Sequence, residues 1–396
     1  MSFNIKQVRV MIRANLWGLR HRLALSLSMV FSITLVVCVL AGFLSMAAGF
    51  ERVLKGSGSA SVAVILGGGA RQEMGSDLSP DAIRGIRALS GDIGVIRDAN
   101  GDLIASRELV VTVAAPQGDT VLALRGMDPA GPALRDGITM SAGRMFTPGS
   151  REIVVGEGIT RNLPGFAVGD TVRLGALDWQ VVGHFAANGS AFESEIWADL
   201  ESVRAGFDRQ GQVQSLRLRL TDKAALTTLA AALARLPEGA LTVVSEADLY
   251  AGQSDRTAQL IRLFGWPLAL LMAVGATAGA LNTMASSVAD RSTEIATLRA
   301  LGFGRLAAFL ATWAEAALLA LVGVGLGVVL SWALFNGWQA STLGANNARM
   351  GFRLLVTGDV MLKAAATGLA IGLIGGALPA IAATRLPLTA ALRAKG

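Results

Sequence analysis

The sequence predicts an α-helical membrane protein with four transmembrane helices and one large α+β domain inserted between the first and second of them. Three observations predict this class. The 396-residue chain is 52% hydrophobic and only 16% charged, which is too apolar for an ordinary soluble enzyme. Four long apolar stretches are each long enough to cross a bilayer. Between the first two stretches, roughly 200 residues have the mixed composition of a soluble domain.

The first span is predicted at Leu23–Ala48, about 26 residues without a charge, which can cross roughly 30 Å of hydrocarbon. A cleaved signal peptide is the competing interpretation, because Ser45-Met46-Ala47 resembles a cleavage site. The apolar run and its leader are both too long for a signal peptide, which favours a retained span. Three later stretches predict the other spans: Leu263–Val288, Leu306–Trp332 and Val360–Ala383.

The expected organisation follows from these stretches. In chain order it is a cytoplasmic amphipathic helix (1–22), the first span (23–48), an α+β domain with stalk helices (49–259), the second span (260–289), a connector (290–304), the third span (305–335), a short loop (336–359), the fourth span (360–383) and a tail (384–396).

Basic residues near the span ends predict the orientation. They form three groups, which precede the first span, lie between the second and third, and follow the fourth: Lys6, Arg9, Arg13, Arg20 and Arg22; Arg291, Arg299 and Arg305; Arg385, Arg393 and Lys395. With four spans, the three groups lie on the same side of the membrane. The positive-inside rule therefore predicts an inner-membrane protein with both termini in the cytoplasm and the large domain in the periplasm. Arg349 and Arg353, in the loop 336–359, are a mild exception.

The large domain alternates short β-runs with helices. Ser79-Pro80-Asp81 predicts a helix start, with a serine N-cap and proline at the first helical position. Gly175 predicts the turn of a hairpin that joins Thr171–Leu174 to Trp179–Val182. The other predicted elements are strands at Ala60–Leu66, Leu109–Ala114, Val121–Arg125, Ile153–Val155, Leu216–Leu220 and Thr242–Val244, and a helix at Lys223–Leu236. The polar segment Glu246–Arg262 is expected to continue as a helix into the second span.

Several classes of function find no support in the residues. Cys38 is the one cysteine, and His21 and His184 lie far apart, so no metal-ligand spacing occurs. No lysine follows a glycine, which excludes a P-loop in this sequence. HExxH and GxSxG motifs are absent, and no basic stripe with interleaved aromatic residues suggests nucleic-acid binding.

Glu315 is the one acidic residue deep in a predicted span. An interhelical hydrogen bond is the favoured interpretation of this residue over a proton relay.

Glycines one helical turn apart in the predicted spans indicate close helix packing. They are Gly275 and Gly279, Gly323 and Gly327, and Gly368, Gly372 and Gly376.

The N-terminal segment predicts a basic amphipathic helix. Apolar residues recur at helical spacing, and basic residues fall on another face. The apolar ones are Ile5, Val8, Ile12, Leu16 and Leu19. A topology anchor and a specific role in coupling both remain open for this helix.

The connector predicts a short helix, with Asp290 or Ser292 as its cap and Gly302 or Gly304 at its end. Ile295, Leu298 and Leu301 would form an apolar face, and three polar residues would lie elsewhere: Arg291, Glu294 and Arg299. Such a helix is either an inert turn or a docking surface that presents apolar anchors to a partner protein.

The connector resembles the coupling region of FtsX-like permeases, the membrane subunits of type VII ABC transporters of the MacB, LolC/LolE and DevC kind. The family pattern R-x-x-E-I-x-x-L-R-A-L-G is met at Arg291, Glu294, Ile295, Leu298, Arg299, Ala300, Leu301 and Gly302. Glu315, Gly323 and Gly327 resemble the family's E-x(7)-G-x(3)-G in the third span, and 383–393 is similar to its usual ending. Ile153–Gly158 and Val168–Gly183 resemble its periplasmic core domain. Thr384 and Leu388 depart from the pattern.

The resemblance implies a half-size permease that binds no cofactor itself and works with a separate cytoplasmic ABC ATPase dimer, which binds ATP and Mg²⁺. It also implies a second copy or a similar permease, contact with membrane lipid, and, for an exporter, a periplasmic adaptor and an outer-membrane channel. The substrate would be a lipid, lipoprotein, peptide or amphipathic drug. A membrane sensor would need a cytoplasmic output domain, and a secondary transporter would need internal repeats and paired charges at the midplane. These two classes are the alternatives.

Overall fold

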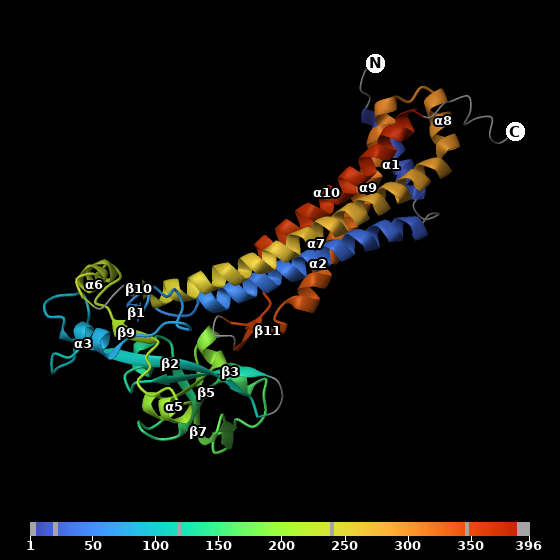
Figure 1. Ribbon diagram of the computed structural model, residues 1–396. Helices are drawn as coiled ribbons and strands as arrows, with labels where there is room; N and C mark the ends of the chain where they lie inside the picture. Colours follow the sequence, from blue (N-terminus) through green and yellow to red (C-terminus); the bar gives the residue numbers. More distant parts are fainter. Residues whose placement is uncertain (1–4, 19–22, 117–119, 238–240, 345–347, 386–396) are drawn as a thin grey trace. The chain divides into compact units, whose positions relative to one another are not determined.

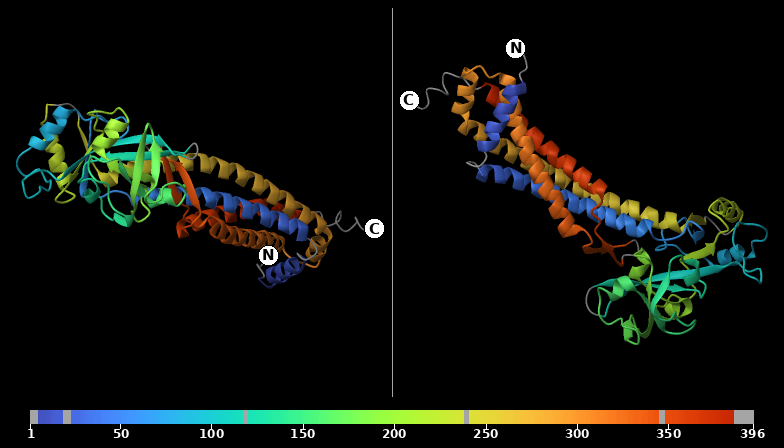
Figure 2. Two further views of the ribbon diagram at one scale, coloured as in Figure 1. Left: turned by 90° about the horizontal axis from the view of Figure 1, so that it is seen from below. Right: turned by 180° about the vertical axis from the view of Figure 1, so that it is seen from behind.

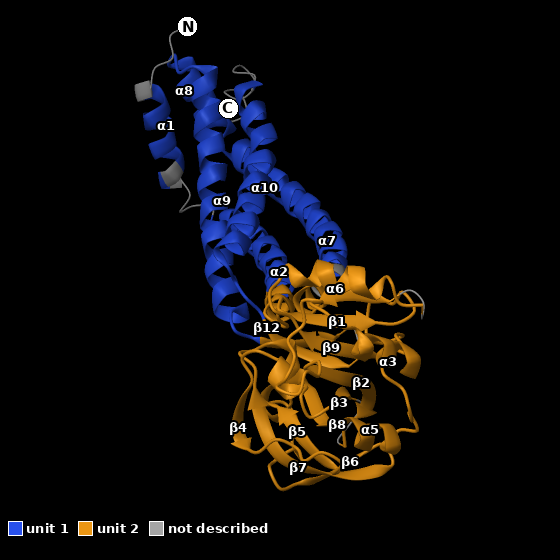
Figure 3. Cartoon of the chain, turned by 90° about the vertical axis from the view of Figure 1, so that its left-hand side faces the viewer, with its two compact units in different colours: residues 1–48, 259–338, 354–396 blue, residues 49–258, 339–353 orange. Residues whose placement is uncertain are grey.

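The computed structural model describes residues 5–18, 23–116, 120–237, 241–344 and 348–385 (Figure 1). The chain divides into two compact units, which Figure 3 shows in different colours. The helical unit contains residues 1–48, 259–338 and 354–396, and the sheet unit contains residues 49–258 and 339–353. Two helices, α2 (Leu23–Lys55) and α7 (Glu246–Asp290), therefore contribute residues to both units.

Four helices in the described part of the chain are long and apolar enough to span a membrane. They are α2, α7, α9 (Arg305–Phe335) and α10 (Gly358–Arg385). Their inner faces form one apolar core, to which Ile33, Ala280, Ala320 and Ile371 belong, and Figure 2 shows the helices running beside one another. Two shorter helices, α1 (Ile5–Gly18) and α8 (Ser292–Ala300), complete this unit. The prediction of four transmembrane helices is confirmed.

The sheet unit is built on a ten-stranded mixed sheet, as far as the described residues show. The strand order is β10-β1-β9-β2-β3-β8-β5-β7-β4, with β6 paired to β7. The pairs β3–β8 and β5–β7 are parallel and the others antiparallel. The strands are β1 (Val62–Leu66), β2 (Ala105–Ala114), β3 (Val121–Met127), β4 (Thr139–Gly143), β5 (Glu152–Gly156), β6 (Thr171–Leu174), β7 (Leu177–Ala186), β8 (Glu195–Asp199), β9 (Ser215–Arg219) and β10 (Thr242–Ser245).

Short helices cover two apolar clusters on this sheet. The α3 helix (Pro80–Ala88) and α6 helix (Ala225–Leu233) pack where β1 and β9 lie, around Ile86, Leu218 and Leu229. The α5 helix (Leu200–Gly206) packs against β2, β3 and β8, and α4 (Glu157–Thr160) follows β5. Ser79 caps α3 as predicted, because its Oγ accepts the N–H of Ala82 at 3.1 Å. The inserted α+β domain is confirmed.

Some elements of the sheet unit escape the sequence analysis. Strand β8 is fully buried, although it begins with Glu195 and ends with Asp199. Acidic residues at both ends of so short a segment are more typical of a loop. Strand β4 is exposed along its length and carries no alternating pattern. The loop 336–359 contains a hairpin of β11 (Gln339–Leu343) and β12 (Arg349–Arg353), whose residues belong to the sheet unit.

Candidate functional site

The connector is a short helix held between two sharp changes of direction. Only Arg291, at φ −100°, separates the end of α7 from the start of α8. At the other end, the N–H of Gly302 bonds to the carbonyl of Arg299 and the N–H of Phe303 bonds to that of Leu298. This is a Schellman ending, in which Gly302 takes the left-handed φ of +96° that glycine tolerates best. Neither Asp290 nor Ser292 is the N-cap, a correction to the sequence analysis, because Arg291 occupies that position without a side-chain cap.

The apolar residues of α8 do not share one exposed face. Ile295 is buried and Leu298 half-buried in a cluster with Met11, Val288 and Ala307, so the two predicted anchors pack inside this chain. Leu301, in contrast, is 74% exposed. Glu294 and Gly302 are also exposed, and Arg299 is half-buried. The exposed part of the connector therefore includes Leu301 but neither of the other two predicted anchors, Ile295 and Leu298.

Arg291 does not lie on that surface either. Its guanidinium is buried, donates to the backbone carbonyl and the hydroxyl of Ser287 at 3.3 and 3.2 Å, and pairs with the carboxylate of Glu315 in α9. The side chains of Arg291 and Glu315 are each 4% exposed. Glu315 thus joins two helices, but its main partner is an arginine of the connector. Sequence reasoning assigned the two residues to separate features and missed the pair.

Helix α1 packs against the connector region. Val8, Met11 and Ile12 enter the same apolar cluster as Ile295, and the Gln7 side-chain oxygen accepts the N–H of Gly304 at 3.4 Å. The opposite face exposes two apolar residues beside two basic ones: Val10 and Trp17, Arg9 and Arg13. The side chains of Ile5, Lys6 and Leu16, the residues Leu19, Arg20 and Arg22, and those of the tail beyond Arg385 lie outside the described structure.

Two glycines of α9 bring α2 into backbone contact. A Cβ at Gly327 would lie 2.7 Å from Val37, and one at Gly323 would lie 2.9 Å from the carbonyl oxygen of Val30. At this short separation, Thr34 donates its hydroxyl to the carbonyl of Gly323 at 3.0 Å. One turn further along, the Cys38 thiol donates to the carbonyl of Gly327 at 3.4 Å. Small residues therefore allow polar groups of one spanning helix to reach the backbone of another.

The glycines of α10 also sit in tight contacts. A Cβ at Gly368 would lie 2.5 Å from Val37, one at Gly372 would lie 2.2 Å from the Cβ of Ala320, and one at Gly376 would lie 2.3 Å from that of Ala316. Gly275 and Gly279 of α7 behave differently: both are exposed, and a Cβ at either would meet no described atom within 4 Å. The expectation of close packing at these two glycines is wrong within this chain, because their face of α7 points away from the helical core.

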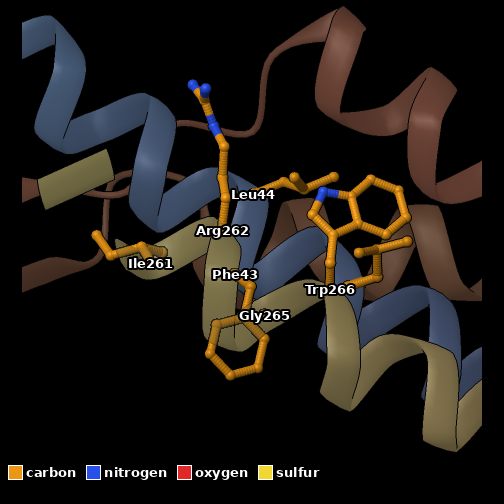
Figure 4. Close-up of a pocket in the computed structure, with 7 residues that line it drawn as sticks. Phe43, Leu44, Ile261, Arg262, Gly265 and Trp266 are labelled. Atoms are coloured by element: carbon orange, nitrogen blue, oxygen red, sulfur yellow. The ribbon is translucent and has the colours of Figure 1, made fainter. Parts of the chain in front are cut away.

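A shallow groove lies between α2 and α7 within the helical unit. It is lined mainly by apolar groups from both helices (Figure 4): Leu40, Phe43, Leu44, Ile261, Arg262, Gly265 and Trp266. Phe43 lies against Gly265, where a Cβ would be 3.3 Å from the phenyl ring. The exposed Trp266 indole and the Arg262 guanidinium lie four residues apart on α7, so the groove combines an apolar lining with a cation at its edge.

The sheet unit contains a buried charge network. Arg125 and Arg217 are fully buried and share Glu73 and Glu108, with nitrogen–oxygen distances of 2.6–3.0 Å. Arg125 also binds Glu195, Arg217 binds Glu246, and Arg135 binds Glu108. Burial alone would raise the pKa of Glu73, but the charges of Arg125 and Arg217 outweigh it and hold the pKa well below its ordinary value. These carboxylates are paired with arginines, which identifies the network as structural.

Two protein families match the chain. The family described as MacB-like periplasmic core domain matches residues 26–236, more than half of the chain, and the family described as FtsX-like permease C-terminal matches residues 267–388. A macrolide export ATP-binding/permease protein MacB from Photorhabdus laumondii is 26% identical over 57% of this chain and 35% of its own length. The MacB of Bordetella avium is 23% identical over 82% of this chain and 54% of its own length. The chain thus aligns with about half or less of these relatives.

Two solved structures resemble parts of the chain. The extracellular domain of the noncanonic ABC-type transporter YknZ from Gram-positive bacteria has 16% identity and a TM-score of 0.34, and covers 46% of this chain and 99% of its own. The periplasmic region of MacB from Actinobacillus actinomycetemcomitans has 14% identity and a TM-score of 0.34, and covers 53% of this chain and 95% of its own.

Proposed function

Because the chain belongs to the family of MacB-like and FtsX-like permeases of ABC transporters, we propose that it couples ATP hydrolysis by a separate cytoplasmic ATPase to movement of its sheet unit. The observation that carries the proposal is the order of the two family matches along one chain. The first ends before α7 and the second begins within it, so the connector lies inside the permease match. In this account the chain is the non-catalytic membrane subunit of the transporter.

The proposal includes a topology. Both termini and the connector lie in the cytoplasm, and the sheet unit lies in the periplasm. The distribution of basic residues supports it, because Arg9, Arg13, Arg299 and Arg305 flank the apolar stretches on the same side. The exposed Val10 and Trp17 of α1, next to Arg9 and Arg13, suit a helix that lies in the inner lipid interface.

The ATPase would contact the exposed part of the connector. Leu301 offers an exposed apolar side chain, and Glu294 offers a negative charge about two turns earlier. The buried Ile295 and Arg291 would serve a different purpose, since they fix α8 to α9 and α1. A force applied at Leu301 would then displace α8 together with the helices that it packs against. ATP and Mg²⁺ would bind the partner, because the sequence has no Gly-Lys-Ser/Thr step of its own.

The substrate class is an amphipathic molecule: a drug, lipid, lipoprotein or peptide. The two curated relatives are named for macrolide export. A second permease copy would complete the complex, and a periplasmic adaptor and an outer-membrane channel would join it in an exporter. The pair of Glu315 with Arg291 lies where α7 ends and the connector begins, so it does not supply the paired midplane charges that the secondary-transporter alternative requires.

Copurification tests this function. The tagged chain would be purified in mild detergent from its native host, and its partners identified by mass spectrometry. We expect a P-loop ATPase that is lost in Leu301→Asp and weakened in Glu294→Lys. Leu343→Asp is the matched control, because Leu343 is an exposed leucine of β11 in the sheet unit. A chain that purifies without an ATPase, or one whose ATPase depends on Leu343 instead of Leu301, would contradict the proposal.

A further inference from the structure

A four-residue 3₁₀ turn in the sheet unit, Ala191–Ser194, contacts every segment that leads from this unit to the helical unit. Three segments make that connection: the end of α2, the beginning of α7, and the hairpin β11–β12 between α9 and α10. The residues that make these contacts all belong to the sheet unit. Each residue of the turn has a different structural partner.

The first residue of the turn binds the end of α2. The N–H of Ala191 donates to the hydroxyl of Ser57 at 2.7 Å, and that hydroxyl donates to the carbonyl of Val53 in the last turns of α2 at 2.6 Å. Ser57 is completely buried. Because one hydroxyl links the two backbones, a displacement of the end of α2 changes a hydrogen bond of the turn.

The second residue packs against α7. The ring of Phe192 meets the ring of Tyr250 edge to face, with centroids 5.3 Å apart. Both side chains are buried. The Phe192 ring also meets the ring of Trp197 in β8 edge to face, with centroids 6.1 Å apart. The Arg135 guanidinium lies 5.2 Å from the centroid of each of these two rings. The turn therefore connects the first turns of α7 to the interior of the sheet.

The fourth residue binds the hairpin. The hydroxyl of Ser194 accepts the N–H of Gly351 in β12 at 3.2 Å. The neighbouring Phe352 packs edge to face on Phe50 of α2, with centroids 5.7 Å apart. Hairpin and helix end are thus in contact with each other as well as with the turn.

The third residue fixes the turn to the sheet. The Glu193 carboxylate accepts the N–H groups of Ala187 and Gly189, just beyond β7, at 3.0 and 2.8 Å. The backbone of Glu193 packs against the end of β5, because a Cβ at Gly156 would lie 2.4 Å from the main-chain carbonyl oxygen of Glu193. Strand β8 follows the turn directly. Three neighbouring strands therefore contact the turn, and close packing ties its position to theirs.

We propose that the turn Ala191–Ser194 is the junction through which movements of α2, α7 and the hairpin reach the sheet. The inference rests on the proposed function and specifies the route by which the sheet unit responds to ATP. Ser57, Phe192 and Ser194 act in it as positioning residues. Rigid packing on β5, β7 and β8 lets one small turn combine three inputs into a single displacement of the sheet.

The test measures the response of the sheet unit to nucleotide. The full chain in complex with its ATPase, in lipid nanodiscs, would be followed by hydrogen exchange with and without a non-hydrolysable ATP analogue. In the wild type we expect a nucleotide-dependent change of exchange at β5 and β8. The double variant Ser57→Ala/Ser194→Ala removes two hydrogen-bond acceptors without removing apolar volume, and Phe192→Leu removes the aromatic contact. We expect both to lose the nucleotide-dependent change while they keep ATPase binding and basal ATP hydrolysis.

Ser202→Ala is the matched control, because Ser202 bonds to Asp199 at the opposite end of β8. It should respond like the wild type. Unchanged melting temperatures of the two turn variants would exclude unfolding as the cause. A nucleotide response that persists in both turn variants, or is equally lost in Ser202→Ala, would overturn the junction and leave the proposed function intact. A wild type that binds no ATPase would overturn the proposed function itself.

Discussion

The guanidinium of Arg291 and the carboxylate of Glu315 form a buried ion pair that joins the start of α8 to α9, 24 residues further along the chain. Arg291 lies between two helices and also binds Ser287 in the last turn of α7. One side chain therefore fixes α7, α8 and α9 to one another. In the proposed function, this attachment would let a short connector pass movement on to the spanning helices.

Removal of one member of this pair should destabilise the protein. Glu315→Ala would leave a buried, uncompensated arginine, and such a change costs about 3–5 kcal/mol of unfolding free energy. Arg291→Met combined with Glu315→Leu should recover most of the loss, because apolar pairs of similar size replace buried ion pairs well. Lys363→Ala is the control: its pair with Asp359 is exposed, and such pairs contribute about 0–1 kcal/mol. Thermal unfolding in detergent measures all three, and equal losses for Glu315→Ala and Lys363→Ala would contradict the assignment.

Glycines with the same spacing should respond in opposite directions. Gly372→Ala places a Cβ 2.2 Å from that of Ala320, so α9 and α10 must separate, and such overpacking costs about 1–3 kcal/mol. Gly279→Ala meets no described atom within 4 Å, and the higher helix propensity of alanine should raise stability by about 1 kcal/mol at most. The melting temperatures of the two variants in detergent test this. A lower melting temperature for Gly279→Ala would mean that this face of α7 packs against something else.

The buried network predicts how stability depends on pH. The pKa values of Glu73 and Glu108 are lowered in the folded protein, because their arginine partners outweigh the effect of burial. Groups with a lowered folded pKa contribute stability above their ordinary pKa of 4.5, and this contribution is lost as the pH falls through the folded value. We therefore expect the urea midpoint of the full chain in detergent to change little from pH 7 to 5 and to fall below pH 4.5. Glu73→Gln should lower the midpoint at pH 7 and flatten the acid-side decrease, whereas a midpoint that rises on acidification would contradict the network's role.

Local signals account for the parts of the structure that the sequence predicts. Long apolar runs predict spans wherever they occur, and Ser79-Pro80 predicts the start of α3 through contacts within one turn. The hairpin around Gly175 is equally local, since its left-handed φ of +65° is a property of the turn itself. Such features need no knowledge of distant residues.

Long-range contacts decide the rest. Ile295, Leu298 and Leu301 recur at helical spacing, and the packing of α1, α7, α9 and α10 separates the buried residues from the exposed one. Gly279 and Gly327 have the same local pattern, and the position of α2 alone distinguishes them. Strand β8 looks polar in the sequence, and it can be buried because Glu195 is neutralised by Arg125, which lies 70 residues away in the sequence. No local pattern contains this information.

Cysteine cross-linking tests the central claim, contact between the connector and an ATPase, most directly. In a Cys38→Ala background, Leu301→Cys and Leu343→Cys would each be treated in native membranes with a short bifunctional cross-linker, and adducts identified by mass spectrometry. Both leucines are more than half exposed, at 74% and 61%, so reactivity is matched. The account predicts an adduct between position 301 and a P-loop ATPase, and none at position 343. An ATPase adduct at position 343 alone, or no ATPase at position 301 despite full labelling of the thiol, would contradict it.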